Sequence, residues 1–197
     1  MVKIGIFIIP NLLLKNKILK FKKDFKKQFG NATYLNHLPH CTLYVFKTAN
    51  KNLKEFKKIK NISINRRKNY SIDKNDIFFN DPITKKNTYI IKLKKNNFLK
   101  NLQKTLLKTF CKYALKSNDN FKNNTMNQNF RLYGYPFINM NWKPHFTIGS
   151  ISFKKNQYEF IKKFKKKIAY KKQFLNKIFL YKIKRNNHKL LCKINIK

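Results

Sequence analysis

Acidic residues are scarce in this chain. Its 197 residues include seven Asp and Glu against 47 Lys and Arg, a formal net charge of +40 at pH 7, which excludes an acidic-surface protein. Lysine outnumbers arginine 43 to 4, as AT-rich codons would produce, and many lysines could simply cover solvated helix faces. Codons for Asp and Glu can be equally AT-rich, however. The positive field is therefore a physical property, and a polyanion such as nucleic acid or nucleotide is the expected partner.

Cysteine and long apolar runs are also scarce. Cys41, Cys111 and Cys192 are odd in number and widely spaced, which argues against a disulfide framework or a zinc ribbon and favours a reducing compartment. No run approaches the roughly 18 apolar residues that span a bilayer. The apolar stretch at residues 4 to 14 is interrupted by Asn11, and no small-residue cleavage site follows it. We therefore expect a cytoplasmic protein.

Glycine and proline are few, at four and five residues, whereas 42% of the chain is hydrophobic and 15% aromatic. This is enough apolar material for the core of one medium domain or of two small lobes. Intrinsic disorder is therefore not expected for most of the chain.

Hydrophobic periodicity predicts five elements in the first half of the chain. These are a strand at residues 2–9, a helix at 11–29, a strand at 40–47, a short helix at 50–60 and a strand or hairpin region at about 62–80. In the first helix Asn11 is the expected N-cap, and Gly30 lies where a helix C-terminus favours a left-handed residue. One apolar stripe follows that helix, formed by Leu14, Ile18, Phe21, Phe25 and Phe29.

The second half repeats this order. We expect a strand at 88–94, a helix capped by Asn97, a polar loop at about 117–141, a strand at 145–152, a helix opened by Asn156 and Glu159 as a capping box, and two strands at about 174–183 and 189–196 joined by a turn at 185–188. The repeated order predicts an α+β fold with two related lobes, at about 1–82 and 83–197, within one domain of residues 1–197.

One motif occurs in both halves, at the start of the central strand of each. It reads His40-Cys41-Thr42-Leu43 in the first and His145-Phe146-Thr147-Ile148 in the second. Side chains alternate across a strand, so the His and Thr of each motif share one face while their neighbours point into the helix layer. If a pseudo-twofold axis relates the halves, two imidazoles and two hydroxyls converge on one cleft.

Such a set suits phosphoester chemistry without a metal. One imidazole can take a proton from the attacking oxygen while the other gives a proton to the leaving oxygen, each contributing about 10²- to 10⁴-fold in rate. The Thr hydroxyls can donate to the phosphate oxygens. A single His-x-Thr is more often an ordinary strand end, but two of only four histidines share this motif. His37 has no companion metal ligands at suitable spacing and is expected in a loop; His188, in the final turn, receives no role.

The two motifs also carry a resemblance. Together with Ile8-Ile9-Pro10 at the end of the opening strand and Trp142-Lys143-Pro144 before the second motif, they resemble the 2H phosphoesterase superfamily, and within it the 2′-5′ RNA ligase-like and cyclic phosphodiesterase group. The resemblance implies a bilobal fold with two antiparallel sheets flanked by helices around a central cleft. It implies action on 2′,3′-cyclic phosphates, 2′-5′ linkages or RNA ends, with His40 and His145 as the catalytic pair and Thr42 and Thr147 as phosphate-binding residues.

Other readings remain open. The Asn-rich segment 117–141 is either a solvated, mobile insertion or a border of the cleft, in which case Arg131, Tyr133 and Lys143 are substrate contacts. The protein as a whole could be a non-catalytic RNA-binding protein that keeps the fold, although binding through lysines needs no paired imidazoles. Attachment to anionic membranes through the helix at 11–29 is weaker, because its apolar stripe is needed in the core. We expect a monomer, with RNA or nucleotide as its partner and no cofactor, metal or membrane.

Overall fold

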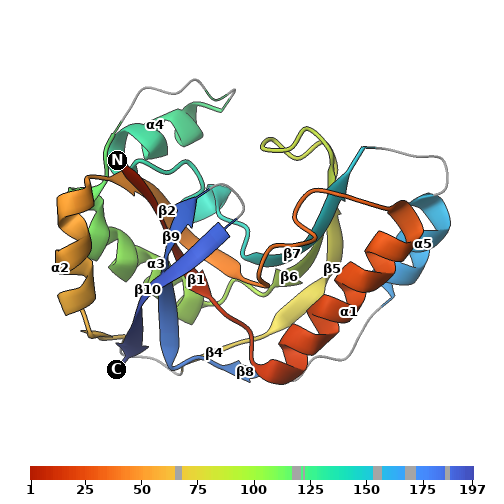
Figure 1. Ribbon diagram of the computed structural model, residues 1–197, viewed down its shortest axis with the longest axis horizontal. Coiled ribbons are helices and arrows are strands. Elements are labelled where there is room, and N and C mark those ends of the chain that lie inside the picture. The colour runs from red at the N-terminus through yellow and green to blue at the C-terminus, as the bar shows by residue number, and fades with distance from the viewer. Residues whose placement is uncertain (65–67, 117–120, 122, 153–156, 167–171, 185–186) are drawn as a thin grey trace.

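An eight-stranded β-sheet runs through the molecule, with helices packed on it (Figure 1). The computed structural model describes residues 1–64, 68–116, 121, 123–152, 157–166, 172–184 and 187–197. The strand order is β3-β10-β9-β1-β2-β7-β6-β5, and β4 and β8 form a second, two-stranded sheet. The strands are β1 (Val2–Ile8), β2 (Cys41–Thr48), β3 (Asn61–Ile62), β4 (Asn69–Tyr70), β5 (Ile72–Phe78), β6 (Asn87–Leu93), β7 (His145–Ile151), β8 (Gln173–Phe174), β9 (Lys177–Lys184) and β10 (Asn187–Ile196).

The helices divide between the two halves of this sheet (Figure 1). They are α1 (Leu12–Phe29), α2 (Leu53–Lys58), α3 (Asn97–Phe110), α4 (Asn124–Tyr133) and α5 (Gln157–Lys165), with short 3₁₀ turns at Asn50–Asn52, Cys111–Tyr113 and Asn139–Asn141. Helix α1 contacts β7 and helix α5 contacts β5. On the other half of the sheet, α3 contacts β2 and α2 contacts β10. The predicted α+β class with two sheets is confirmed.

The two halves of the large sheet meet at β2 and β7, through the single residue pair Cys41 and Phe146. On one side of this junction β1 pairs with both β2 and β9, so the C-terminal strands lie beside the N-terminal strand. The other side is built from β7, β6 and β5. Each half of the molecule therefore draws on chain from both sides of residue 82.

Helix α1 begins and ends where its sequence signals lie. The Asn11 side chain accepts a hydrogen bond from the Leu14 amide at 2.9 Å, and Gly30 follows the last turn with φ of +75°, which favours glycine. The apolar stripe is buried except for Phe21, which is half-buried. A buried side chain of this size contributes about 1.5–3 kcal/mol, so the stripe fastens α1 to the sheet. The prediction for this helix is confirmed.

Two local predictions need correction. The N-cap of α3 is Asn96 and not Asn97, because the Asn96 side chain accepts from the amide three residues on, that of Leu99, at 2.9 Å. The segment 117–141 is not a loop throughout, since its residues 124–133 form α4. Asn123 caps this helix with a hydrogen bond from the Met126 amide, and the buried Asn129 donates to carbonyls of the chain beyond the helix.

Other expectations fall outside the described residues. Residues 117–120 and 122 of the Asn-rich segment, Asn156 of the expected capping box, and residues 185 and 186 of the final turn are not described. Within the described ranges, none of the helices combines the length and the apolar character that crossing a bilayer requires.

Candidate active site

A cavity of about 540 Å³ is lined by the polar residues of both repeated motifs, His40, Thr42, His145 and Thr147. The strand pairing explains why they meet. Cys41 and Phe146 face each other where β2 and β7 join, and both are fully buried. Because side chains alternate along a strand, the residues on either side of this pair point together to the opposite face of the sheet.

Trp142 ties the two motifs together. This residue precedes the second motif, yet its indole N–H donates to the carbonyl of Thr42 in the first motif at 2.9 Å, and its side chain is buried. A buried indole needs such a partner, and satisfying it fixes the approach of the chain to His145.

Both motif histidines are anchored in the same way. The Nδ1 atom of His40 lies 2.6 Å from the carbonyl oxygen of Leu38, and the Nδ1 atom of His145 lies 2.6 Å from that of Lys143. A carbonyl oxygen can only accept, so Nδ1 carries the proton in both rings. In the neutral imidazole, Nε2 is then the free base, available to a molecule in the cavity.

The surroundings of His40 favour its neutral form. Burial is the main cause and lowers the pKa of His40 from 6.5 to about 3. The hydrogen bond to the Leu38 carbonyl acts in the opposite direction. Positive charge on His188, His37 and Lys22 lowers the pKa further. His40 is therefore a neutral imidazole at physiological pH.

His145 has a different neighbour. Burial is the main cause and holds the pKa of His145 below its ordinary value of 6.5, although the hydrogen bond to Lys143 and the negative charge of Asp81 act in the opposite direction. Asp81 lies in the turn between β5 and β6, where its Oδ1 accepts from the amides of Ile83 and Thr84 at 2.7 and 3.3 Å. Of the two anchored histidines, only His145 has a carboxylate acting on its pKa.

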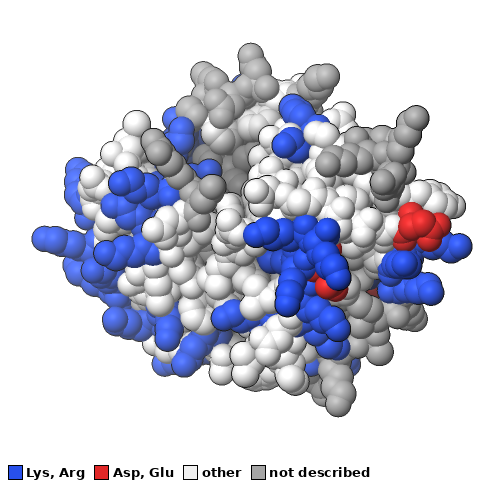
Figure 2. All heavy atoms as spheres, turned by 45° about the vertical axis from the view of Figure 1, so that its right-hand side comes forward, with Lys and Arg blue, Asp and Glu red and all other residues white. Residues whose placement is uncertain are grey.

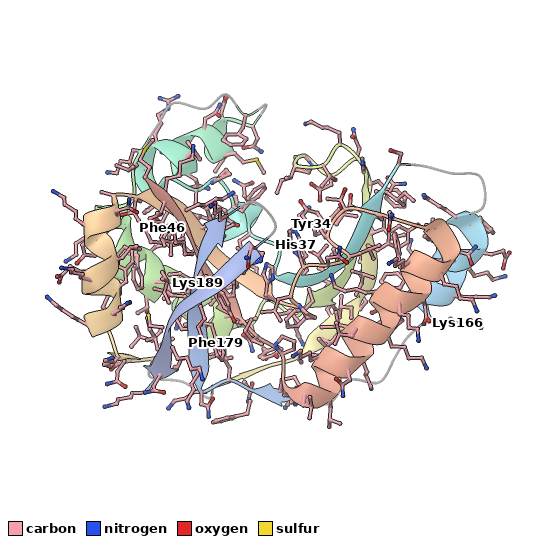
Figure 3. The ribbon with its side chains drawn as sticks, in the orientation of Figure 1. Tyr34, His37, Phe46, Lys166, Phe179 and Lys189 are labelled. Carbon is pink, nitrogen blue, oxygen red and sulfur yellow. The ribbon has the colours of Figure 1, made fainter. Side chains whose placement is uncertain are left out.

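Three other segments complete the cavity. The β5–β6 turn contributes an apolar wall that includes Phe78, Phe79 and Ile83, and the chain at and after α4 contributes Met126, Tyr135, Phe137 and Asn141. The third segment follows α1 and places Tyr34 and His37 at the cavity, as Figure 3 shows from their positions between the two halves of the molecule. The buried Lys22 holds this segment through hydrogen bonds to the carbonyls of Tyr34 and Leu35.

Of the three residues expected to contact substrate, one lines the cavity and two do not. Lys143 lines the cavity, with its Nζ atom 5.6 Å from the centroid of the Phe78 ring. Arg131 and Tyr133, at the end of α4, do not line it: Arg131 is exposed, and the Tyr133 ring packs against the core. From this helix Met126 is the side chain that reaches the cavity.

Three of the four histidines, His37, His40 and His145, line the cavity, and the fourth, His188, lies beside two of them. The ring centroid of His188 lies 5.3 Å from that of His40 and 5.4 Å from that of His37. We gave neither His37 nor His188 a role from the sequence; the scarcity of histidine was the one available signal. Among the described residues, no group of three or more His, Cys, Asp or Glu is placed to hold a metal ion.

Charge is distributed unevenly between the cavity and the surface. Figure 2 shows lysine and arginine spread over one face of the molecule with only small acidic patches. Apart from histidine, Lys143 and Asp81 are the only ionisable side chains with a charge at pH 7 among the described residues that line the cavity. Among the described residues, the excess positive charge therefore lies almost wholly outside the cavity.

Several solved structures share this fold. One is a crystal structure described as a phosphoesterase. The match covers 100% of this chain and 98% of the phosphoesterase chain, with a TM-score of 0.50 and 10% sequence identity. Two structures of E. coli LigT have the same coverage: the complex with 3′-AMP has a TM-score of 0.52 at 10% identity, and the complex with NADP⁺ has 0.53 at 9%. No protein-family model and no curated protein matches the sequence. At these identities the likeness concerns the fold.

Proposed function

We propose that this protein is a metal-independent phosphoesterase that acts on RNA ends or nucleotides carrying a 2′,3′-cyclic phosphate or a 2′-5′ linkage. The observation that carries the proposal is the meeting of two identically anchored histidines, each with a threonine on the same strand face, in one cavity. Nucleotides bound to two of the LigT structures, which share the fold, support a nucleotide as the ligand.

The surroundings of the two histidines indicate which is the general base and which is the general acid. A general base must start without a proton on Nε2, and the lowered pKa of His40 meets that condition. A general acid must start with that proton. Burial lowers the pKa of His145, but the carboxylate of Asp81 acts in the opposite direction, and the anionic phosphate of a bound substrate would do the same. We therefore assign His40 as the base and His145 as the acid.

The reaction on a 2′,3′-cyclic phosphate then proceeds in one displacement. His40 Nε2 takes a proton from water as the water oxygen bonds to phosphorus. His145 Nε2 gives its proton to the ribose oxygen as the phosphorus–oxygen bond of the ring breaks, and the product is a phosphomonoester. Thr42 and Thr147 donate hydrogen bonds to the non-bridging oxygens, where negative charge increases in the transition state.

The test is incubation of the purified protein with 2′,3′-cyclic mononucleotides, 2′-5′ dinucleotides and 3′-end-labelled RNA, followed by identification of the products. We expect turnover of at least one of these classes in the presence of EDTA, with His145→Ala as the inactive control for contaminating nucleases. Turnover that EDTA abolishes and added zinc or manganese restores would contradict the metal-independent mechanism. Tight RNA binding without turnover of any substrate would favour a non-catalytic RNA-binding protein.

A further inference from the structure

His40 is in contact with rings from two other strands. The ring centroid of Phe7 in β1 lies 4.1 Å from that of His40 with the planes 35° apart, and the His188 ring of β10 is 5.3 Å away. The rings of Phe7 and His188 are 5.7 Å apart, so the three form one cluster. We infer that Phe7 and His188 are positioning residues that hold the His40 imidazole in one orientation, which makes β10 part of the active site.

A β-bulge in β2 places Thr42 on the same face of the sheet as Phe7. The pairing of β1 with β2 shifts between Ile6 and Phe7, so Ile6 lies opposite Tyr44 but Phe7 lies opposite Thr42. Leu43 is the extra residue in β2, since β1 pairs with β9 without a shift. Without it Thr42 would lie opposite Ile8 and share the buried face of that residue instead of the face of Phe7. Bulges of this kind commonly redirect a side chain next to an active site.

Gly5 makes room for the Phe7 ring. A Cβ atom at Gly5 would lie 2.2 Å from Cζ of Phe7 and 2.8 Å from Cδ1 of Ile183. The ring therefore occupies the space above the glycine, and it is almost fully buried. Because the Phe7 ring fills the space over Gly5 and is almost fully buried, it can act as a fixed surface for His40.

The second histidine has no comparable support. His145 has the same Nδ1 hydrogen bond, but its ring contact is with the edge-on Phe78, 5.0 Å away. A single hydrogen bond leaves a ring free to rock about the line between donor and acceptor, whereas contact with a second ring face limits this motion. The residue proposed to start as the base is thus the one with the fixed orientation, and the inference rests on that proposed function.

The charged groups around this cluster all lower the pKa values of its histidines. His37 comes from the segment after α1, Lys22 from α1 and Lys3 from β1. Positive charge on the first two lowers the pKa of His40, and positive charge on His37 and Lys3 lowers that of His188, which burial lowers most. The cluster therefore favours neutral imidazoles packed against each other.

Two pairs of variants test the inference. His188→Ala should lower kcat by roughly 3- to 10-fold with KM changed less than about twofold, and His188→Phe, which keeps a ring, should restore most of the rate. The exposed neighbour Lys189, on the same strand, gives the control Lys189→Ala. Phe7→Leu should act like His188→Ala. Its control is Phe46→Leu, which changes a buried Phe packed against Tyr44, Phe56 and Phe110 rather than against a histidine.

NMR of the imidazole rings gives a readout that does not require activity. The chain has only four histidines, so their ring signals can be assigned by substitution. We expect the His40 ring signals to shift in Phe7→Leu and His188→Ala and to remain in place in both controls. Unshifted His40 signals, or full kcat in both variants, would overturn the inference. If the wild type lacks activity, the proposed function fails, and the His40 signals alone then decide whether Phe7 and His188 orient the ring.

Discussion

Gly5→Ala is the substitution that most directly tests how the sheet supports the active site. The new methyl group would lie 2.2 and 2.7 Å from Cζ and Cε1 of Phe7 and 2.8 Å from Cδ1 of Ile183, distances that real Cβ atoms essentially never show. The backbone cannot relieve the overlap easily, because β1 is paired on both sides, with β2 and β9. The Phe7 ring must therefore move, and the nearest ring in contact with it is that of His40.

Overpacking of this kind costs about 1–3 kcal/mol of unfolding free energy. For a chain of this length each kcal/mol lowers Tm by roughly 2–4 °C, so we expect a decrease of about 2–12 °C. With the Phe7 ring displaced, kcat should fall by about tenfold while KM stays nearly constant. Calorimetry and steady-state kinetics on a 2′,3′-cyclic nucleotide, well below the lowered Tm, measure the two effects separately.

The matched control is Gly149→Ala in β7. Its methyl group would lie 3.0 Å from Cε1 of Phe25, a core ring on α1 that contacts no histidine. This variant should lose stability without a specific loss of kcat. If Gly5→Ala lowers Tm and retains full kcat, or if both variants lose kcat in proportion to stability, the reasoning that links Gly5 through Phe7 to His40 is refuted.

Three further predictions concern the chemistry itself. His40→Ala and His145→Ala should each abolish turnover with the fold intact by circular dichroism, whereas Thr42→Ala and Thr147→Ala should cost about 10- to 10³-fold; a His variant that keeps a tenth of kcat would exclude the two-histidine mechanism. Asp81→Asn keeps the acceptor for the turn amides but removes the charge that raises the pKa of His145, so the alkaline limb of the kcat profile should move to lower pH; movement of the acidic limb alone would reverse the assigned roles. RNA binding should weaken steeply with salt, by roughly 0.7 in log K for each phosphate contacted per tenfold increase, while KM for a cyclic mononucleotide changes little; a flat response for both would mean that the surface lysines do not act on the substrate.

Local sequence patterns predicted much of the fold because the forces they report act over a few residues. The cap at Asn11, the stripe along α1 and the left-handed Gly30 each depend on contacts within one helix or against one face. The shared face of His40 and Thr42 follows from strand alternation alone. The same local reasoning misplaced the α3 cap by one residue, since Asn96 and Asn97 are adjacent and only the hydrogen bond to Leu99 distinguishes them.

Other features depend on strand order, which no local pattern specifies. His188 lies beside His40 because β10 pairs with β9, β9 with β1, and β1 with β2. The bulge in β2 that places Thr42 on the face of Phe7 likewise requires knowledge of which strand lies opposite. Helix α4 was missed for a different reason: asparagine has low helix propensity, and here Asn123 and Asn129 stabilise the helix through a cap and through bonds to the chain beyond it.

The distribution of charge bears on what the protein would bind outside its cavity. One lysine and one aspartate among the described lining residues suit a ligand with a single charged phosphate at the histidines, since a second phosphate inside would find no further lysine or arginine there. The other described lysines can then act only on parts of a substrate that extend beyond the cavity. A basic surface around a nearly neutral cavity would raise the concentration of RNA near the cavity. It would not bind the terminal nucleotide inside the cavity more tightly. Long substrates would therefore be attracted, while the release of a small product would be unaffected.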